Sequence, residues 1–423
     1  MIETMKKRVL FLSAMTLLAA VLFIAGCKKN PTPISLGTLV VGDIDLNGVT
    51  APTNVPVQPA ITATFNIAVD QATAVAANIT LTQDYDDADI PLNIEVSGST
   101  VTITPTAPLA HGALYVLSVS AGLKATNGEP LVALTRSFTT VGAFLPKGYF
   151  AYWPLDGNAN DLGGTYNAAG GGVIDITFET GRNTAAGQAA KFNGTTSLIE
   201  IPNGDVIENS SDFTLSFWMK SDTTAKRSQF VMGLSAWQGF QFEYNSNIYG
   251  NQIGQCKLAA QYSLSGGGSA SQDLWFDGSG STKDNGGWKG WTFCKDLVSS
   301  NGTGVNGLLA NKWAHIVCTY NHTTKIGTMY INGEKMKEQD FNLYGTDHAL
   351  YNATGLVWAG TAGNNILAFG FIQDKTNPTV TDDWASYAIT TNNHFQGWLD
   401  DIAVYHSVLS PTLITQMYNS GKP

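Results

Sequence analysis

Residues 311–339, NKWAHIVCTYNHTTKIGTMYINGEKMKEQ, constrain the fold of this chain more than any other stretch, because they are typical of two antiparallel strands. Four apolar side chains are expected near one face of the first strand, namely Trp313, Ile316, Cys318 and Tyr320. The polar residues 321–325 favour a turn. Asn332-Gly333 then supplies the pair that a tight primed turn prefers, since both central residues need φ > 0. The stretch therefore predicts a β-hairpin with an apolar face.

The rest of the chain shows many short alternating apolar runs, which indicate an all-β fold. Its 423 residues suffice for two or three domains. A net charge of −10, with no basic stripe after residue 30, argues against a nucleic-acid partner, which would need cations to neutralise phosphates.

The hairpin also carries a resemblance. Its W-x-H-[IV] and TY, followed by Y-[IV]-N-G, resemble the laminin-G-like branch of the concanavalin A-type jelly rolls. Further landmarks of that family occur in the same order, at residues 149–164, 187–203, 212–222 and 397–421. The resemblance implies one jelly-roll β-sandwich over residues 149–423, and a lectin-type function. A short helix is expected to begin at Ser410-Pro411, because Pro follows a capping Ser.

Residues 38–141 read as a smaller sandwich of about seven short strands, which is an immunoglobulin-like layout. The runs NVPVQPAITATFNIAVD, NITLT and SGSTVTITPTAPLAHGALYVLSVSAGLKATNG resemble the bacterial Ig-like domain of cell-envelope proteins. That resemblance implies a spacer or adaptor. Residues 142–148 are the expected linker between the two domains.

The N-terminus resembles a bacterial lipoprotein signal over residues 1–27. Three basic residues precede an apolar run that ends in Ile24-Ala25-Gly26-Cys27. The resemblance implies cleavage before Cys27 and lipidation of that residue, with residues 28–37 as a tether. A transmembrane anchor is the alternative, but the apolar run is shorter than the roughly 20 residues a spanning helix needs. Lys28 stands where an inner-membrane retention signal would carry Asp, which favours the outer membrane.

Two stretches depart from the family skeleton and are expected to be inserted loops, residues 263–309 and residues 369–395. Both combine aromatic rings with Gly, Ser, Asn and Asp. A sugar ring stacks its C–H face on an aromatic ring while its hydroxyls bind nearby amides and carboxylates. The residues predicted to bind a carbohydrate are Trp275, Trp288, Trp291, Trp384 and Tyr387. Alternatively, each ring staples its loop to the sandwich as part of a small satellite core. Trp218 and Trp313, by contrast, lie within predicted strands and are expected to be core residues.

A structural calcium ion is a second expectation. The early loop DGNAND offers oxygens at alternate positions, and the family resemblance implies an ion between this loop and the Asp pair before the last strand. The candidate ligands are Asp156, Asn158, Asp161 and Asp400. The alternative is that these side chains cap turns by bonding their own backbone.

Cys256 and Cys294 flank most of the first insertion, and an envelope location permits a disulfide between them. If they do not pair, both are expected to be buried thiols, like Cys318.

Signs of catalysis are weak. Glycosidases of this fold place carboxylates at alternate positions of one strand, and the nearest match, IDITFE at 174–179, has Thr177 where a middle acid would stand. Asp175 and Glu179 are therefore expected to face solvent.

Together these patterns predict an envelope lipoprotein that binds a carbohydrate or another surface polymer without altering it. The alternatives are a divergent glycoside hydrolase and a structural or adhesive protein that binds another protein.

Overall fold

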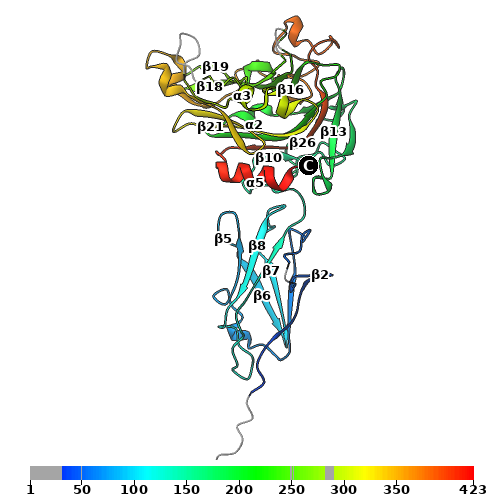
Figure 1. Cartoon of the computed structure of the whole chain (residues 1–423), viewed down its shortest axis with the longest axis vertical. Coiled ribbons are helices and arrows are strands. Elements are labelled where there is room, and N and C mark those ends of the chain that lie inside the picture. The colour runs from blue at the N-terminus through cyan, green and yellow to red at the C-terminus, as the bar shows by residue number, and fades with distance from the viewer. Residues whose placement is uncertain (1–30, 49, 248–249, 251, 282–289) are drawn as a thin grey trace, which may run out of the picture. The chain divides into compact units, whose positions relative to one another are not determined.

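The computed structural model describes residues 31–48, 50–247, 250, 252–281 and 290–423. The chain divides into two compact units. The N-terminal unit ends at Thr139, and the C-terminal unit runs from Thr140 to Pro423 and includes Ala110–Ala113. Both units are built from antiparallel β-sheets (Figure 1), so the all-β prediction is confirmed.

The N-terminal unit is a sandwich of a five-stranded and a four-stranded sheet. The first sheet has the order β2-β1-β3-β7-β6, with β1 Leu36–Val41, β2 Ile44–Asp45, β3 Ile61–Phe65, β6 Leu92–Ser97 and β7 Thr100–Pro105. The second has the order β5-β4-β8-β9, with β4 Ile79–Gln83, β5 Ala88–Asp89, β8 Leu114–Val119 and β9 Leu134–Thr139. Alternate residues of β3, β4, β7 and β8 are buried between the sheets, as the period of two in the sequence predicts.

The C-terminal unit is a larger sandwich of a nine-stranded and an eight-stranded sheet. The nine-stranded sheet has the order β12-β13-β26-β15-β21-β22-β23-β20, and β10 also pairs with β26. Its strands are β10 Ala151–Trp153, β12 Thr177–Thr180, β13 Gln188–Asn193, β15 Phe213–Ser221, β20 Trp291–Cys294, β21 Trp313–Asn321, β22 Ile326–Ile331, β23 Glu334–Asp340 and β26 Gln396–Tyr405.

The eight-stranded sheet has the order β11-β14-β25-β16-β17-β18-β19, and β24 also pairs with β18. Its strands are β11 Val173–Ile174, β14 Leu198–Ile201, β16 Ser228–Leu234, β17 Phe240–Asn245, β18 Gln255–Leu264, β19 Ser269–Phe276, β24 Ala353–Leu356 and β25 Leu367–Phe369. The two sheets enclose one large apolar core. Side chains at the alternate positions form the outer face of each sheet.

Short helices fill the connections. They are α2 Gly204–Glu208, α3 Leu297–Asn301, α4 Asn306–Leu309 and α5 Pro411–Gly421, with 3₁₀ turns η1 Gln71–Thr73, η2 Thr184–Ala186, η3 Ala236–Gln238, η4 Phe341–Tyr344, η5 Ala349–Asn352 and η6 Asp383–Ala385. Helix α5, red in Figure 1, begins after Ser410, whose hydroxyl accepts the amide hydrogen of Leu413. The predicted helix start is confirmed. Tyr418 of α5 stacks on Trp218, so the helix covers part of the outer face of the nine-stranded sheet.

The predicted hairpin is formed by β21 and β22, and Asn332 and Gly333 both have positive φ, as expected of the turn that follows. One detail of the prediction is wrong. Ile316, Cys318 and Tyr320 point into the core, whereas Trp313 is half-buried. Because side chains alternate along a strand, an odd-numbered residue cannot share the face of three even-numbered ones. Trp313 therefore lies on the outer face of the nine-stranded sheet.

The expectation that residues 263–309 form an inserted loop is also wrong for most of its described part. Residues 269–276 form β19, which pairs with β18 over its whole length. Residues 291–294 form β20, and α3 and α4 follow. The alternation in SASQDLWF is a strand signal that the Gly-rich surroundings obscured. Residues 370–395, by contrast, contain no strand and only the turn η6 among the secondary-structure elements described.

Candidate functional site

The outer face of the eight-stranded sheet carries two of the aromatic residues that the sequence predicts to bind a carbohydrate. Trp275 lies on β19 and is half-buried, while Trp384 lies on η6 and is 40% exposed. Strand pairing places Phe230, Glu243, Lys257 and Trp275 opposite one another on β16, β17, β18 and β19. Trp384 packs edge-on against Phe230, with ring centroids 6.1 Å apart. We call these five residues the Glu243 row.

The direction of these side chains follows from their neighbours. Phe242, Leu258 and Phe276 alternate with row positions and lie in the main core, so the row points away from it. Neighbouring strands are about 4.8 Å apart, so the row from β16 to β19 spans roughly 14 Å. The row is therefore a strip with aromatic rings at both ends and charged groups between them.

The charged groups of the row are held together by Lys257. Its ammonium lies 3.5 Å from Glu243 Oε1 and 3.1 Å from Asp273 Oδ2. The side chains of Glu243, Lys257 and Asp273 are 24%, 21% and 41% exposed, so solvent or a ligand can reach all three. Burial raises the pKa of Glu243, Lys257 opposes that rise and Asp273 adds to it. Burial alone would lower the pKa of Lys257, but Glu243 and Asp273 raise it overall.

Amide groups line the same face beside the row. Gln241 lies two residues before Glu243 on β17 and donates a hydrogen bond from Nε2 to Glu243 Oε1. Its own Oε1 is buried, without a hydrogen-bond partner among the described residues. Gln261 and Ser271 pair across β18 and β19 on this face. Carboxylate, ammonium and amide groups between two indoles provide both the hydrogen bonding and the stacking that a sugar requires.

Sequence reasoning missed Glu243, Lys257 and Gln241. The signal was present in FQFEYN, residues 240–245, where polar side chains alternate with aromatic ones that belong in a core. The carboxylates considered in the sequence were instead those of IDITFE, residues 174–179. In the structure Asp175 is exposed and accepts a hydrogen bond from the Thr196 hydroxyl, and Glu179 binds Lys191, so neither belongs to the Glu243 row.

The other aromatic residues predicted to bind a carbohydrate do not belong to the Glu243 row. Trp291, on β20, is only 7% exposed, and the ammonium of the fully buried Lys337 lies 2.8 Å from its ring centroid. Sugar binding by Trp291 stays a prediction, and this burial fits the alternative reading, in which the ring staples its segment to the sandwich. Tyr387 packs edge-on against Phe371 and donates its hydroxyl to Thr196 O, so it belongs to a satellite core under residues 370–395. Trp288 lies outside the described residues.

The predicted calcium ligands have other partners. Asp161 accepts hydrogen bonds from the backbone amides of Tyr152, Thr165 and Tyr166. Asn158 caps its own turn by accepting from the amide of Asn160. These contacts are those of the alternative reading, in which Asp and Asn hold turns together.

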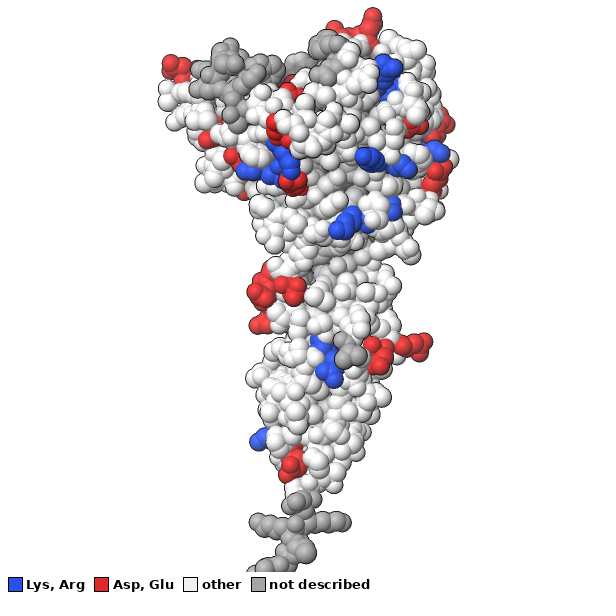
Figure 2. Space-filling model, in the orientation of Figure 1, with Lys and Arg blue, Asp and Glu red and all other residues white. Residues whose placement is uncertain are grey.

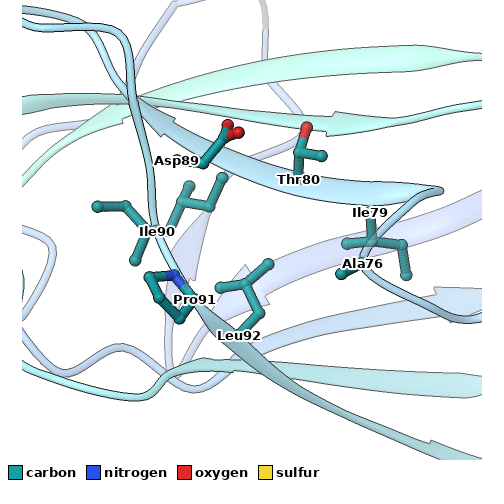
Figure 3. A pocket seen from close by; sticks show the side chains of 8 residues that line it. Ala76, Ile79, Thr80, Asp89, Ile90, Pro91 and Leu92 are labelled. Carbon is teal, nitrogen blue, oxygen red and sulfur yellow. The ribbon is translucent and has the colours of Figure 1, made fainter.

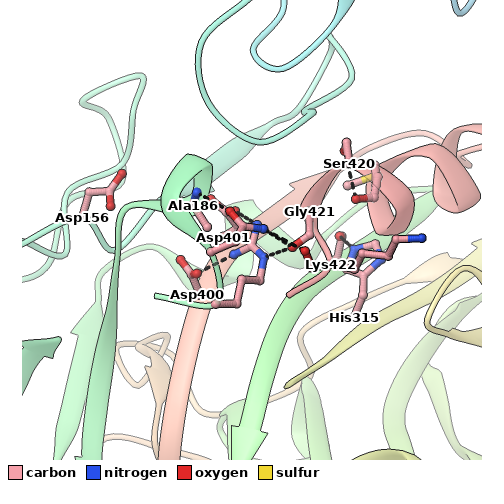
Figure 4. Close-up of polar contacts among 12 residues, drawn as sticks. Asp156, Ala186, His315, Asp400, Asp401, Ser420, Gly421 and Lys422 are labelled. Carbon is pink, nitrogen blue, oxygen red and sulfur yellow. Dashed lines mark hydrogen bonds and ion pairs between the residues drawn. The ribbon is translucent and has the colours of Figure 1, made fainter. Parts of the chain in front are cut away.

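Asp400 faces a cation that the chain itself supplies (Figure 4). The buried Arg182 guanidinium binds both Asp400 and Asp401, and its Nε donates to Gly421 O at 2.6 Å. Burial raises the pKa of Asp400. The neighbouring carboxylates of Asp401 and Asp156 add to this rise, and the Arg182 guanidinium opposes it. No group of three or more His, Cys, Asp or Glu side chains that could hold a metal occurs in the described part of the chain. Calcium binding by Asp156, Asn158, Asp161 and Asp400 stays a prediction, and these contacts do not fit it.

The predicted disulfide does not form in this structure. Cys256 and Cys294 are free and buried. Cys256 lies on β18 of the eight-stranded sheet, with its thiol 3.6 Å from Met329 Sδ, whereas Cys294 lies on β20 at the edge of the nine-stranded sheet. The two residues flank one segment in sequence, but that segment passes from one sheet to the other. Burial raises the pKa of both thiols.

The N-terminal unit has a groove of about 200 Å³ between β4 and β6 (Figure 3). Its lining is mostly aliphatic, from Ile79, Leu81, Ile90, Pro91 and Leu92. Polar side chains do not converge on it as they do in a ligand site, so it has the character of an open edge of the sandwich.

The surface charge is sparse on the side of the molecule shown in Figure 2. Lys and Arg form small separate groups there, interspersed with Asp and Glu, and most of the surface carries neither. Cys27 lies outside the described residues. Within the described part of the chain, no helix is both long enough and apolar enough to span a membrane.

Comparison with known families supports the two-domain composition. A family model described as the concanavalin A-like lectin/glucanases superfamily matches residues 193–415, which is more than half of the chain. A model described as a bacterial Ig-like domain matches residues 45–140. No curated protein matches the chain.

Several solved structures are similar to part of the chain. Domain 4 of AbnA, a GH43 extracellular arabinanase from Geobacillus stearothermophilus solved with arabinotriose, is 17% identical with a TM-score of 0.38, and the match covers 64% of this chain and 98% of that one. The receptor binding domain of botulinum neurotoxin type G is 16% identical, with a TM-score of 0.35 and coverage of 64% and 51%. The serotype D binding domain is 17% identical, with a TM-score of 0.37 and coverage of 65% and 52%. The chain thus spans about half the length of the two neurotoxin domains.

Proposed function

Because this chain belongs to the concanavalin A-like lectin/glucanases superfamily, we propose that it is a non-catalytic carbohydrate-binding protein of the cell envelope, with its sugar site at the Glu243 row. The observation that carries the proposal is the composition of that row. Trp275 and Trp384 stand at its two ends, and Glu243 and Lys257 lie between them. Such a strip offers stacking surfaces and hydrogen-bonding groups to a chain of sugars laid across the strands.

Binding fits the row better than hydrolysis does. A glycosidase needs one carboxyl group free to give a proton and a second free to attack or to activate water. Here Glu243 and Asp273 both bind the ammonium of Lys257, so neither carboxyl group is free of a partner. Carboxylates accept hydrogen bonds from sugar hydroxyls, and a lectin uses them in that way.

A glycan-array screen of the protein, followed by titration of the strongest ligand, tests the site. Trp275→Ala and Trp384→Ala should each weaken binding by about tenfold, because each removes a stacking ring. Val132→Ala, at a position 83% exposed in the N-terminal unit, is the control and should bind as the wild type does. A chelator should leave the affinity unchanged.

The comparison is valid only if Trp275→Ala and Trp384→Ala keep the wild-type melting temperature. Trp275→Phe, which keeps an aromatic ring, should retain most of the affinity. Wild-type binding that both alanine variants retain would place the sugar elsewhere. A protein that binds no glycan, but binds another envelope protein, would support the adhesive alternative.

We further propose that Cys27 carries the lipid that attaches the protein to the membrane, with the outer membrane as the expected location. Support comes from the basic start, the short apolar run and the Ile24-Ala25-Gly26-Cys27 ending. Cells that express the protein should yield it in the detergent phase, with a mass increase on the peptide that begins at Cys27. Cys27→Ser should move the protein to the aqueous phase. An unmodified peptide from the wild type would refute the anchor.

A further inference from the structure

A second aromatic and cationic strip lies on the opposite side of the C-terminal sandwich, on the nine-stranded sheet. Strand pairing places Lys191 on β13 opposite Trp398 on β26, Trp398 opposite Lys220 on β15, and Lys220 opposite Trp313 on β21. We call these four residues the Lys220 row. With strands about 4.8 Å apart, it spans roughly 14 Å.

The row points away from the core. Ala190, Met219, Ala314 and Leu399 each neighbour a row residue in sequence and are fully buried in the main core. The four row residues are themselves half-buried, and the side chain of Lys191 is 42% exposed. Trp218, two residues before Lys220, is covered by α5, so the row begins where the cover of that helix ends.

The charge at one end of the row is already neutralised. Lys191 Nζ lies 2.9 Å from Glu179 Oε1, and the other oxygen of Glu179 accepts a hydrogen bond from Trp398 Nε1 at 3.1 Å. Lys191 and Glu179 thereby fix the edge of the Trp398 indole.

Lys220 is different. Its ammonium lies 4.9 Å from the centroid of the Trp398 ring, and it forms no ion pair with any residue that the structure describes. The nearby Asp222 carboxylate is bound to Thr224 and Gln396 instead. The Trp313 indole, on the other side of Lys220, has no side-chain hydrogen bond or ring contact within the described part of the chain.

We propose that the Lys220 row binds a carboxylated sugar, such as a uronate residue of an acidic polysaccharide. The C–H face of the sugar ring stacks on Trp313, and its carboxylate binds the Lys220 ammonium one strand away. Trp398 serves as a support that positions Lys220 by a cation–π contact. This site is separate from the Glu243 row, where two carboxylates surround a single ammonium and would repel an anionic sugar.

Calorimetric titration with a galacturonate oligomer tests the proposal, and the fully methyl-esterified oligomer is the matched neutral ligand. The acidic oligomer should bind at least about tenfold more tightly than the ester, because only the acid can pair with an ammonium. Raising NaCl from 50 mM to 500 mM should weaken binding of the acid, since part of the pair is in contact with solvent.

Variants then locate the site. Lys220→Met keeps the aliphatic stem and should lose about tenfold in affinity for the acid, whereas Lys220→Arg should retain it. Lys124→Met, at an exposed lysine of the N-terminal unit, is the matched control and should bind as the wild type does. Trp275→Ala should also bind the acid normally, which separates this site from the Glu243 row.

Three results would overturn the proposal. They are equal affinity for acid and ester, wild-type affinity in a folded Lys220→Met variant, and no binding of the acid at all.

Discussion

Buried ionisable residues make stability depend on pH, and Glu208 is one such residue in the C-terminal unit. It ends helix α2 and is fully buried, and neither carboxyl oxygen has a hydrogen-bond partner among the described residues. Burial raises its pKa well above the ordinary value of 4.5, and Asp205 adds to the rise. The folded protein therefore keeps a proton on Glu208 that the unfolded chain releases.

The sign of the pH effect follows. Below pH 4.5 Glu208 is protonated in both the folded and the unfolded protein. Between pH 4.5 and its raised pKa, it is protonated only in the folded protein. Stability should then fall by up to about 1.4 kcal/mol per pH unit until the folded pKa is reached. Glu208→Gln carries no proton to lose, so urea unfolding from pH 5 to pH 8 should show a flatter profile than the wild type. Parallel profiles for the two proteins would contradict this assignment.

At the same scale, the candidate site was only partly predictable. Trp275 and Trp384 could be named as candidates, because aromatic rings among Gly, Ser and Asp are conspicuous in the sequence. The sequence did not show that these rings share a face with Glu243 and Lys257, because that arrangement depends on the register of four strands separated by turns and loops. The burial of Trp291 could not be predicted, because nothing near it in the sequence shows that Lys337 lies beneath its ring.

At the scale of secondary-structure elements, strand β26 is the element on which the nine-stranded sheet depends. It pairs with β10, β13 and β15, and Gly397 lies within it at φ +146°. A Cβ at this position would come 2.1 Å from Lys220 O and 3.0 Å from Ser221 Cα. Backbone atoms of a central strand cannot move aside cheaply, so a side chain here must distort the sheet.

Gly397→Ala should therefore lower the free energy of unfolding by about 3 kcal/mol or more, through strain and overpacking. Gly266→Ala is the matched control, because its added Cβ would meet nothing within 4 Å and its φ is negative or extended. Urea unfolding of both variants measures the difference. Equal stability of the two would show that β26 tolerates a bulkier residue than its packing implies.

Local pattern was enough to predict most elements that alternate cleanly. The β21–β22 hairpin, its Asn332-Gly333 turn and the Ser410 cap of α5 were all found where the sequence indicated. The strand β19 was lost among Gly and Ser, and the outward direction of Trp313 was misjudged by one step of the alternation. Both errors arose where composition was weighed above the period of two.

At the scale of the whole molecule, the family resemblance was confirmed for both domains. The Ig-like match at 45–140 falls inside the predicted domain at 38–141, and the concanavalin A-like match at 193–415 falls inside the predicted domain at 149–423. Resemblance of this kind follows from landmarks in order along the chain. It does not say which outer face binds a ligand, because every member of such a fold has two.

Those two outer faces point in opposite directions, so the two proposed sites together would give the molecule a mechanical role. With a neutral sugar at the Glu243 row and an acidic sugar at the Lys220 row, one molecule would join two different polymer strands. Mixing the protein with a neutral and an acidic polysaccharide should raise the viscosity well above the sum of the two binary mixtures. A Lys220→Met or Trp275→Ala variant should reduce that excess, because each weakens one of the two sites and leaves the other unchanged.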